Sequence, residues 1–233
     1  WNSDAQNNTV IGTNAGDSFT GTNANYNSLF GYDAGTAITT GDYNTAVGGR
    51  DTLKATTTGS YNVALGNYTL SSNTTTGNNT AVGYAALNAN TASFLTAFGY
   101  QSLLSNTTGT RNTAVGKDAL EANTTGGSNT SVGYDALTDN TTGAYNTALG
   151  DGSLGNNTTA SENTAVGYAA LNLNTTGTRN NALGRSALAS NTTGNYNTAF
   201  GNFALAANTT AEMNTAFGDY ACAESTTGAK LTG

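Results

Sequence analysis

Apolar and polar positions recur along the chain with a period of seventeen residues. Each copy follows the pattern N-T-A-[VLF]-G-x-x-[AS]-L-x-x-N-T-T-G-x-x, of which residues 112–128 are a representative example. The copies begin near residues 8, 27, 44, 62, 79, 95, 112, 129, 146, 163, 180, 197 and 214. A fixed period indicates a repeat architecture in which each copy forms one structural unit.

Seventeen residues are too few for a helical hairpin, a leucine-rich repeat or a propeller blade, and they suit one coil of a β-solenoid. The first strand is Thr-Ala-Val, ended by Gly116, and a second strand is expected around Ala119 and Leu120. Asn-Thr-Thr-Gly is expected to form the return corner, where Asn and Gly tolerate left-handed backbone angles. We therefore predict an all-β fold, a parallel β-solenoid of about thirteen coils, with residues 1–7 as a lead-in and residues 8–233 as one repetitive domain.

Two apolar columns repeat from coil to coil and are predicted to form the structural core. The residues expected in these columns are Leu103, Leu120, Leu137, Leu154, Leu171, Leu188, Leu205 and Cys222, together with Val82, Val115, Val132 and Val166. A cysteine in a leucine column is expected to be a small buried hydrophobe. Side chains alternate across a strand, so Thr113 and Val115 share one face while Asn112 and Ala114 share the other. The strand is thus expected to have a narrow interior face and an outer apolar face that needs a partner.

An asparagine column accompanies the leucines and is expected to stack along the solenoid axis. Its members are Asn106, Asn123, Asn140, Asn157, Asn174, Asn191 and Asn208. Stacked amides can hydrogen-bond to one another in this arrangement.

The tyrosines fall at the predicted corners of the coils. Ring stacking that rigidifies the turns explains this placement. The alternative is a surface-binding aromatic track formed by Tyr84, Tyr100, Tyr134 and Tyr168. Charged residues also occupy corners, where a solvated rim without paired charges is expected.

Composition argues against most chemical functions. The chain has 7 Lys and Arg against 14 Asp and Glu, a net charge of −7, and no basic stripe for a nucleic acid. It has no histidine, so Ser-His and Cys-His catalytic pairs and histidine-ligated metals are excluded. The Gly-Gly-x-Gly-x-Asp motif of calcium-binding rolls is missing, and the spacing does not fit the hexads of a left-handed-helix acyltransferase. We predict no enzyme activity, no cofactor, no metal site and no membrane-inserted segment.

The NTAVG string, with Tyr-x-Ala-Leu and Asn-Thr-Thr-Gly following it, resembles repeats of bacterial surface proteins and of phage or viral tail fibres. It is also similar to the β-roll head domains of trimeric autotransporter adhesins, although the coils of those heads are shorter. The likeness runs from Asn8 to about Lys230. It implies an extracellular location on a cell or virion surface, self-association with a trimer as one form, and adhesion to glycans or matrix.

Together these features predict a non-enzymatic structural protein, the building block of a filament or fibre shaft. Side-by-side association is expected through the outer apolar face. End-to-end stacking is expected because neither end of the sequence carries a recognisable polar cap. A tail fibre or adhesin head that binds cell-surface glycans is one alternative, and an ice-binding protein that presents threonine ladders is another.

Overall fold

The computed structural model describes residues 2–3, 6–19, 23–226, 228 and 230–232. Throughout these residues the regular elements are β-strands joined by turns, with no α-helix. The chain separates into two compact units, Trp1–Arg111 (unit 1) and Asn112–Gly233 (unit 2), and each is described by itself.

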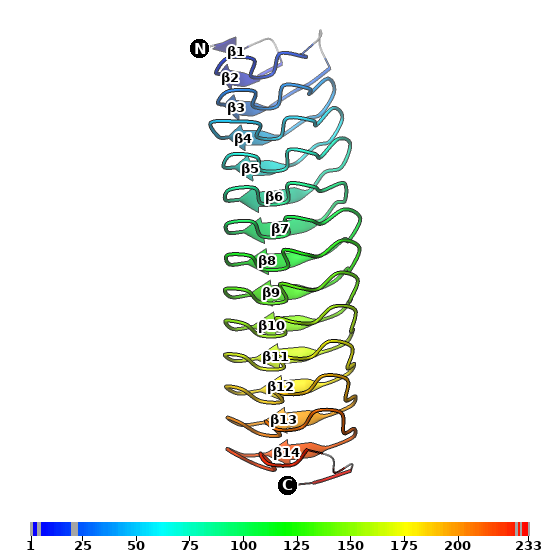
Figure 1. The fold of residues 1–233 in the computed structure, drawn as a ribbon. Coiled ribbons are helices and arrows are strands. Elements are labelled where there is room, and N and C mark those ends of the chain that lie inside the picture. The colour runs from blue at the N-terminus through cyan, green and yellow to red at the C-terminus, as the bar shows by residue number, and fades with distance from the viewer. Residues whose placement is uncertain (1, 4–5, 20–22, 227, 229, 233) are drawn as a thin grey trace. The chain divides into compact units, whose positions relative to one another are not determined.

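Unit 1 holds one short antiparallel strand and a parallel ladder. Its strands are β1 (Asn2–Ser3), β2 (Thr9–Ile11), β3 (Ser28–Phe30), β4 (Thr45–Val47), β5 (Val63–Leu65), β6 (Asn79–Val82) and β7 (Leu95–Phe98). β1 pairs with β2 in antiparallel orientation, with Asn2 opposite Val10. β2 to β7 then pair in chain order, all parallel (Figure 1).

Unit 2 repeats one coil with constant spacing. Its strands are β8 (Thr113–Val115), β9 (Thr130–Val132), β10 (Thr147–Leu149), β11 (Thr164–Val166), β12 (Asn181–Leu183), β13 (Thr198–Phe200) and β14 (Thr215–Phe217). Successive strands are parallel and in register, with Ala148 opposite Ala165 and Leu149 opposite Val166 (Figure 1).

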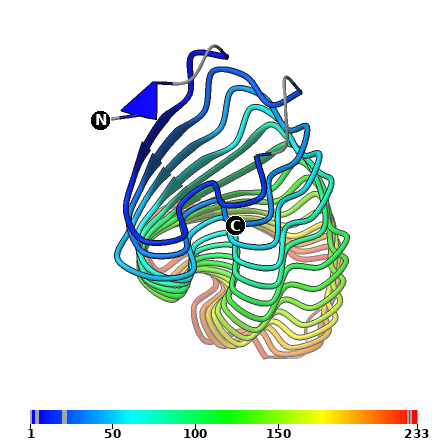
Figure 2. The same cartoon turned by 90° about the horizontal axis from the view of Figure 1, so that it is seen from above.

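The predicted repeat starts are confirmed, because each of the strands β2 to β14 begins at a predicted start or one residue after it. Each coil runs along its strand and returns to the next level through turns. Figure 2 shows this path in the coils of unit 1, where the strands are drawn as arrows. Both units are therefore parallel β-solenoids, and the predicted fold class is confirmed.

The second strand predicted around Ala119 and Leu120 is wrong, because this segment forms turns. Leu120 has a left-handed backbone with φ of 54°, and Asp118 before it has φ of 56°. The Asn123 amide donates to the Leu120 carbonyl at 3.1 Å, which closes a turn, while the Leu120 amide donates to Ala136 of the next coil at 3.1 Å. A left-handed leucine costs roughly 1–2 kcal/mol, and complete burial of its side chain contributes about 1.5–3 kcal/mol.

The Asn-Thr-Thr-Gly corner also differs from expectation, since neither Asn123 nor Gly126 has a positive φ. Glycine is needed at 126 for another reason. A Cβ there would lie 2.2 Å from the Gly143 carbonyl oxygen and 2.6 Å from Asn123 Oδ1. The backbone conformation that requires glycine occurs after the strand, where Gly116 has φ of 136°.

The leucine column forms the interior of each unit. Leu103 in unit 1 and Leu120, Leu137, Leu154, Leu171, Leu188 and Leu205 in unit 2 are fully buried. Cys222 continues the column in sequence but is only half-buried. It is smaller than leucine, and in the described part of unit 2 a leucine stacks on one side of it alone.

The valines predicted as core lie outside it in the single chain. Val82, Val132 and Val166 are half-exposed, and Val115 is 37% exposed. The reason is strand alternation: the central alanine, such as Ala114, points inward and is fully buried, so its neighbours point outward.

The predicted asparagine ladder is confirmed in each unit. In unit 2, Asn140 Nδ2 donates to Asn123 Oδ1 at 2.8 Å, and Asn157 Nδ2 donates to Asn140 Oδ1 at 2.8 Å. The same bond continues through Asn174, Asn191 and Asn208. In unit 1, Asn106 Nδ2 donates to Asn90 Oδ1 at 3.1 Å. These side chains are all fully buried, so each coil completes the hydrogen bonding of the coil next to it.

A second asparagine ladder, which the sequence did not predict, precedes the strands. The Asn146 backbone amide donates to Asn129 Oδ1 at 2.9 Å, and Asn129 Nδ2 donates to the Gly143 carbonyl at 2.9 Å. The corresponding bond in unit 1 joins Leu95 N to Asn79 Oδ1 at 3.1 Å. Leu95 has no side-chain amide, so this ladder ends there within unit 1.

Removing one ladder amide should destabilise unit 2. Asn157 donates to Asn140 Oδ1 and, at 3.0 Å, to the Ala160 carbonyl, and it accepts from Asn174 at 3.0 Å. Asn157→Ala leaves the buried Asn140 Oδ1 without its donor and removes one of the two acceptors of Asn174 Nδ2, while the Ala160 carbonyl still accepts from Asn146. We therefore expect the free energy of unfolding to fall by about 2 kcal/mol. Urea unfolding followed by circular dichroism measures the change.

The matched control for this variant is Thr159→Ala, an exposed position in the same corner. It should change stability by less than about 0.5 kcal/mol. Equal losses in the two variants would show that the amide ladder does not stabilise the coil.

Candidate functional site

A row of apolar side chains stands on the outward face of the strands in unit 2. This row, called the outer stripe, consists of Val115, Val132, Leu149, Val166, Leu183, Phe200 and Phe217. Leu149 is 47% exposed and Phe217 is 73% exposed, and the rings of Phe200 and Phe217 stack with centroids 5.1 Å apart. Parallel sheets are ordinarily covered on both faces, so the stripe is the main candidate interaction surface of the unit.

Threonines share this outward face, two residues before each apolar side chain. They are Thr113, Thr130, Thr147, Thr164, Thr198 and Thr215, with Asn181 at the remaining level. In β10, for example, Thr147 and Leu149 are both exposed while Ala148 between them is buried. The face is thus a regular two-column array, one column hydroxylated and one apolar.

The corner after each strand carries a mixed column of exposed residues. This post-glycine column consists in unit 2 of Lys117, Tyr134, Asp151, Tyr168, Arg185, Asn202 and Asp219. Every second coil carries a charged residue in this column, and the sign of the charge alternates from Lys117 to Asp151, Arg185 and Asp219. This alternation was present in the sequence as a spacing of 34 residues between opposite charges, and sequence reasoning missed it.

The tyrosines of the predicted binding track are all exposed, Tyr84 and Tyr100 in unit 1 and Tyr134 and Tyr168 in unit 2. In unit 1, Tyr84 and Tyr100 stack with ring centroids 5.4 Å apart. In unit 2, Lys117 lies over the Tyr134 ring at 4.9 Å and Arg185 over Tyr168 at 5.8 Å. The Tyr84–Tyr100 pair matches the ring-stacking interpretation, whereas Tyr134 and Tyr168 contact cations of neighbouring coils.

Ring stacking is most regular at the corner before the strands of unit 1. The Tyr26 and Tyr43 rings lie 5.0 Å apart, and those of Tyr43 and Tyr61 lie 5.1 Å apart, nearly parallel in both cases. The three rings are about half exposed. They form a short aromatic ladder that follows the coils.

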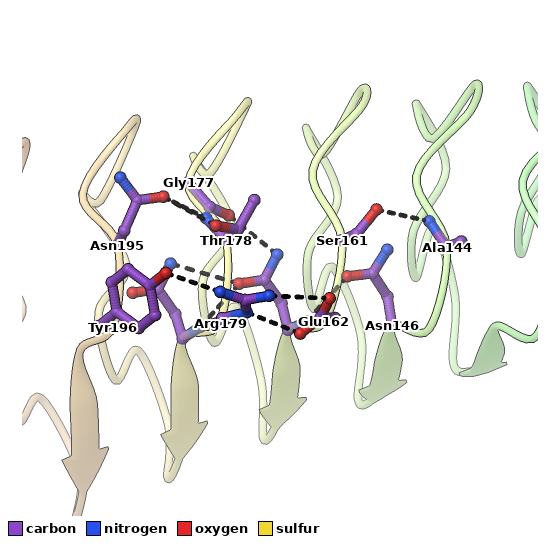
Figure 3. A network of polar contacts seen from close by, with 11 residues as sticks. Ala144, Asn146, Ser161, Glu162, Gly177, Thr178, Arg179, Asn195 and Tyr196 are labelled. Carbon is purple, nitrogen blue, oxygen red and sulfur yellow. Dashed lines mark hydrogen bonds and ion pairs between the residues drawn. The ribbon is translucent and has the colours of Figure 1, made fainter.

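The corner before the strands of unit 2 contains a polar network (Figure 3). Arg179 Nε donates to Glu162 Oε2 at 2.7 Å, and Arg179 Nη1 donates to Tyr196 Oη at 2.7 Å. Beside it, the Thr178 amide donates to Asn195 Oδ1 at 2.8 Å. The expectation of a rim without paired charges is therefore wrong, because a spacing of one coil brings opposite charges together.

The pKa values of the Glu162 and Glu121 carboxyl groups are shifted in opposite directions. The hydrogen bond from Arg179 and its charge lower the pKa of Glu162. Burial raises the pKa of Glu121, and the negative charge of Asp118 adds to that effect. Asp118 forms an ion pair with Lys117 and keeps one buried oxygen, Oδ1, without a hydrogen-bond partner.

The described residues contain no group of three or more His, Cys, Asp or Glu side chains placed to hold a metal ion. A pocket of about 270 Å³ is lined by Ser190, Phe203, Ala206, Ala207, Tyr220, Ala223 and Glu224. Its single carboxylate, Glu224, is exposed, so the lining holds no pair of carboxylates for acid–base work. The described chain also has no helix with the length and apolar character needed to cross a membrane.

Comparison with family models, with curated proteins and with solved structures finds no match for the chain.

Replacing Arg179 should return the pKa of Glu162 to its ordinary range. Arg179→Gln removes the guanidinium, so the carboxylate loses its charged partner and its pKa rises. Because the pKa of Glu162 is lower in the folded chain, the ionised carboxylate stabilises the fold at pH values above the ordinary carboxyl pKa of about 4.3. This stabilisation is lost as the pH falls through the lowered pKa. Carbon-detected NMR titration of the glutamate side chains measures the shift.

Arg185→Gln provides the control, since Arg185 contacts the rings of Tyr168 and Phe203. The pKa of Glu162 should stay lowered in this variant. If the two variants gave the same titration curve, the Arg179 bond would not be the cause.

Proposed function

We propose that the chain is a non-enzymatic structural protein that acts outside the cell, on a cell or virion surface, as a building block of a filament or fibre shaft. Copies associate side by side through the outward face of the strands. The observation that carries this proposal is the outer stripe on a parallel sheet, in which five of the seven apolar side chains are exposed and Val132 and Val166 are half-buried.

The interior of the coil explains why the stripe is outside. Alanine fills the inward position of the strand and asparagine the inward position just before it, as Ala148 does in β10 and Asn146 does immediately before β10. The larger apolar side chains, such as Leu149, are therefore placed on the solvent face. Burying them against another chain contributes about 25 cal/mol for each Å² of apolar surface removed from water, so association is favoured without further chemistry.

A charge in the outer stripe should prevent association. Leu149→Glu places a carboxylate in the middle of the proposed contact, where burial without a partner is costly. We expect at least a tenfold weaker association, measured by sedimentation velocity over a concentration series and by negative-stain electron microscopy.

Leu173→Glu is the matched control, because Leu173 and Leu149 are both 47% exposed and Leu173 lies in the turns. It should associate like the unchanged protein. A monomeric unchanged protein at millimolar concentration would refute the proposal, as would equal effects of the two variants.

A second function, ice binding, is favoured by the threonine column on the same face. Threonine hydroxyl groups recur at six of the seven strands of unit 2, with Asn181 at the seventh, and neighbouring strands in a sheet are about 4.8 Å apart. Three of these threonines are exposed: Thr130, Thr147 and Thr215. A regular array of this kind can order water at an ice surface.

Thermal hysteresis tests this second function directly. An ice-binding face gives hysteresis at micromolar concentration that Thr147→Lys abolishes and Thr142→Lys, at an exposed corner, preserves. Absence of hysteresis in the unchanged protein would exclude it.

A further inference from the structure

The outer stripe of unit 2 has a gradient of side-chain size. It begins with Val115 and Val132, continues through Leu149, Val166 and Leu183, and ends with Phe200 and Phe217. A face with small side chains at one end and large side chains at the other packs evenly against a copy that runs in the opposite direction.

Reversal about the middle coil pairs small side chains with large ones. With Val166 opposite its own copy, Leu149 faces Leu183. The outer levels then place Val132 opposite Phe200 and Val115 opposite Phe217. Every level holds a similar volume, which close packing at an interface requires.

The charges of the post-glycine column independently give the same centre for the two-fold axis. Reversal about Tyr168, in the same coil as Val166, places Asp151 opposite Arg185 and Lys117 opposite Asp219. All four charged residues are exposed. Each charge therefore meets its opposite, and each pair occurs twice in a two-fold dimer.

The corner before the strands is compatible with this arrangement. Reversal places Tyr145 opposite Arg179, a contact of a cation with an aromatic ring. Glu162 lies opposite its own copy, but each carboxylate is already paired with Arg179 at 2.7 Å, which reduces their repulsion.

The parallel two-fold alternative fits less well. When two copies face each other and run in the same direction, the corner before a strand meets the corner after the same strand of the partner. Arg179 then faces Arg185. The stripe places phenylalanine on phenylalanine at one end and valine on valine at the other.

We infer that unit 2 binds a second copy of itself face to face and antiparallel, with a two-fold axis at Val166. This inference rests on the proposed side-by-side association and assigns its partner, its direction and its register. The complementary side-chain sizes and the alternating charges both select the same centre.

Distances between spin labels test the direction of pairing. Nitroxide labels are attached at Thr125→Cys or Thr176→Cys, each with Cys222→Ser; both threonines are exposed and lie in equivalent corners. Thr176 belongs to the coil of Val166, and Thr125 lies three coils away. Antiparallel pairing offsets the two copies of residue 125 by six coils, about 29 Å along the stacking direction, so their distance should exceed that between the copies of residue 176.

Equal distances at the two positions would mean parallel pairing, and a mass of three chains would mean a trimer. Either result overturns the inference while the side-by-side function stands. A protein that stays monomeric overturns both.

A charge swap tests the register. Asp151→Lys should weaken the dimer roughly tenfold, because two attractive pairs become repulsive. Adding Arg185→Glu should restore the dissociation constant to within about threefold. Asp139→Lys makes the same change of charge at an exposed turn position and should leave the dimer intact. Failure of the second substitution to restore binding would contradict the proposed register.

Discussion

Hydrogen bonding between successive coils is the constraint on which both units depend. A coil with alanines and leucines inside cannot satisfy its own buried polar groups, so each asparagine side chain is completed by its neighbours. The amide of Asn140 donates to Asn123 and accepts from Asn157, with all three fully buried. An unpaired amide in such an interior costs more than a made bond contributes, which keeps successive coils in register.

The same constraint explains where the repeat varies in length. In unit 1 the asparagine ladder before the strands bridges coils of different lengths. Its hydrogen bonds join Asn27 to Asn8, 19 positions apart, Asn62 to Asn44, 18 positions apart, and Leu95 to Asn79, 16 positions apart. The bond is kept while the corners absorb the difference. One example is the longer corner at Gly49, whose amide donates to Asn67 Oδ1 at 2.7 Å. Corners can change because water satisfies their exposed backbone groups, whereas the interior has no such substitute.

The narrow interior of the coil also determines which side chains lie on the outer face of the strands. In unit 2 the inward strand positions hold Ala or Ser and the residue before each strand is Asn, so the large apolar residues of the strand, such as Leu149, face outward. In unit 1, Leu29 and Leu95 are exceptions, since both are buried strand residues. The corners on either side of the strand carry tyrosines and charges in columns, where a spacing of one coil brings Arg179 to Glu162. The exposed apolar, aromatic and charged side chains therefore form columns that run across the repeats, and no single copy shows them.

Periodicity by itself determined the parallel β-solenoid, the strand in each coil, the leucine column and the stacked asparagines, because each follows from placing equivalent residues above one another. Only the tertiary structure decided the left-handed turn at Leu120, the half-exposed position of Cys222 and the outward position of Val115. Propensity assigns leucine to regular structure, and nothing local shows that burial outweighs the cost of a positive φ. The ladder before the strands and the Glu162–Arg179 pair likewise required the three-dimensional corner, since the atoms that meet there come from different coils.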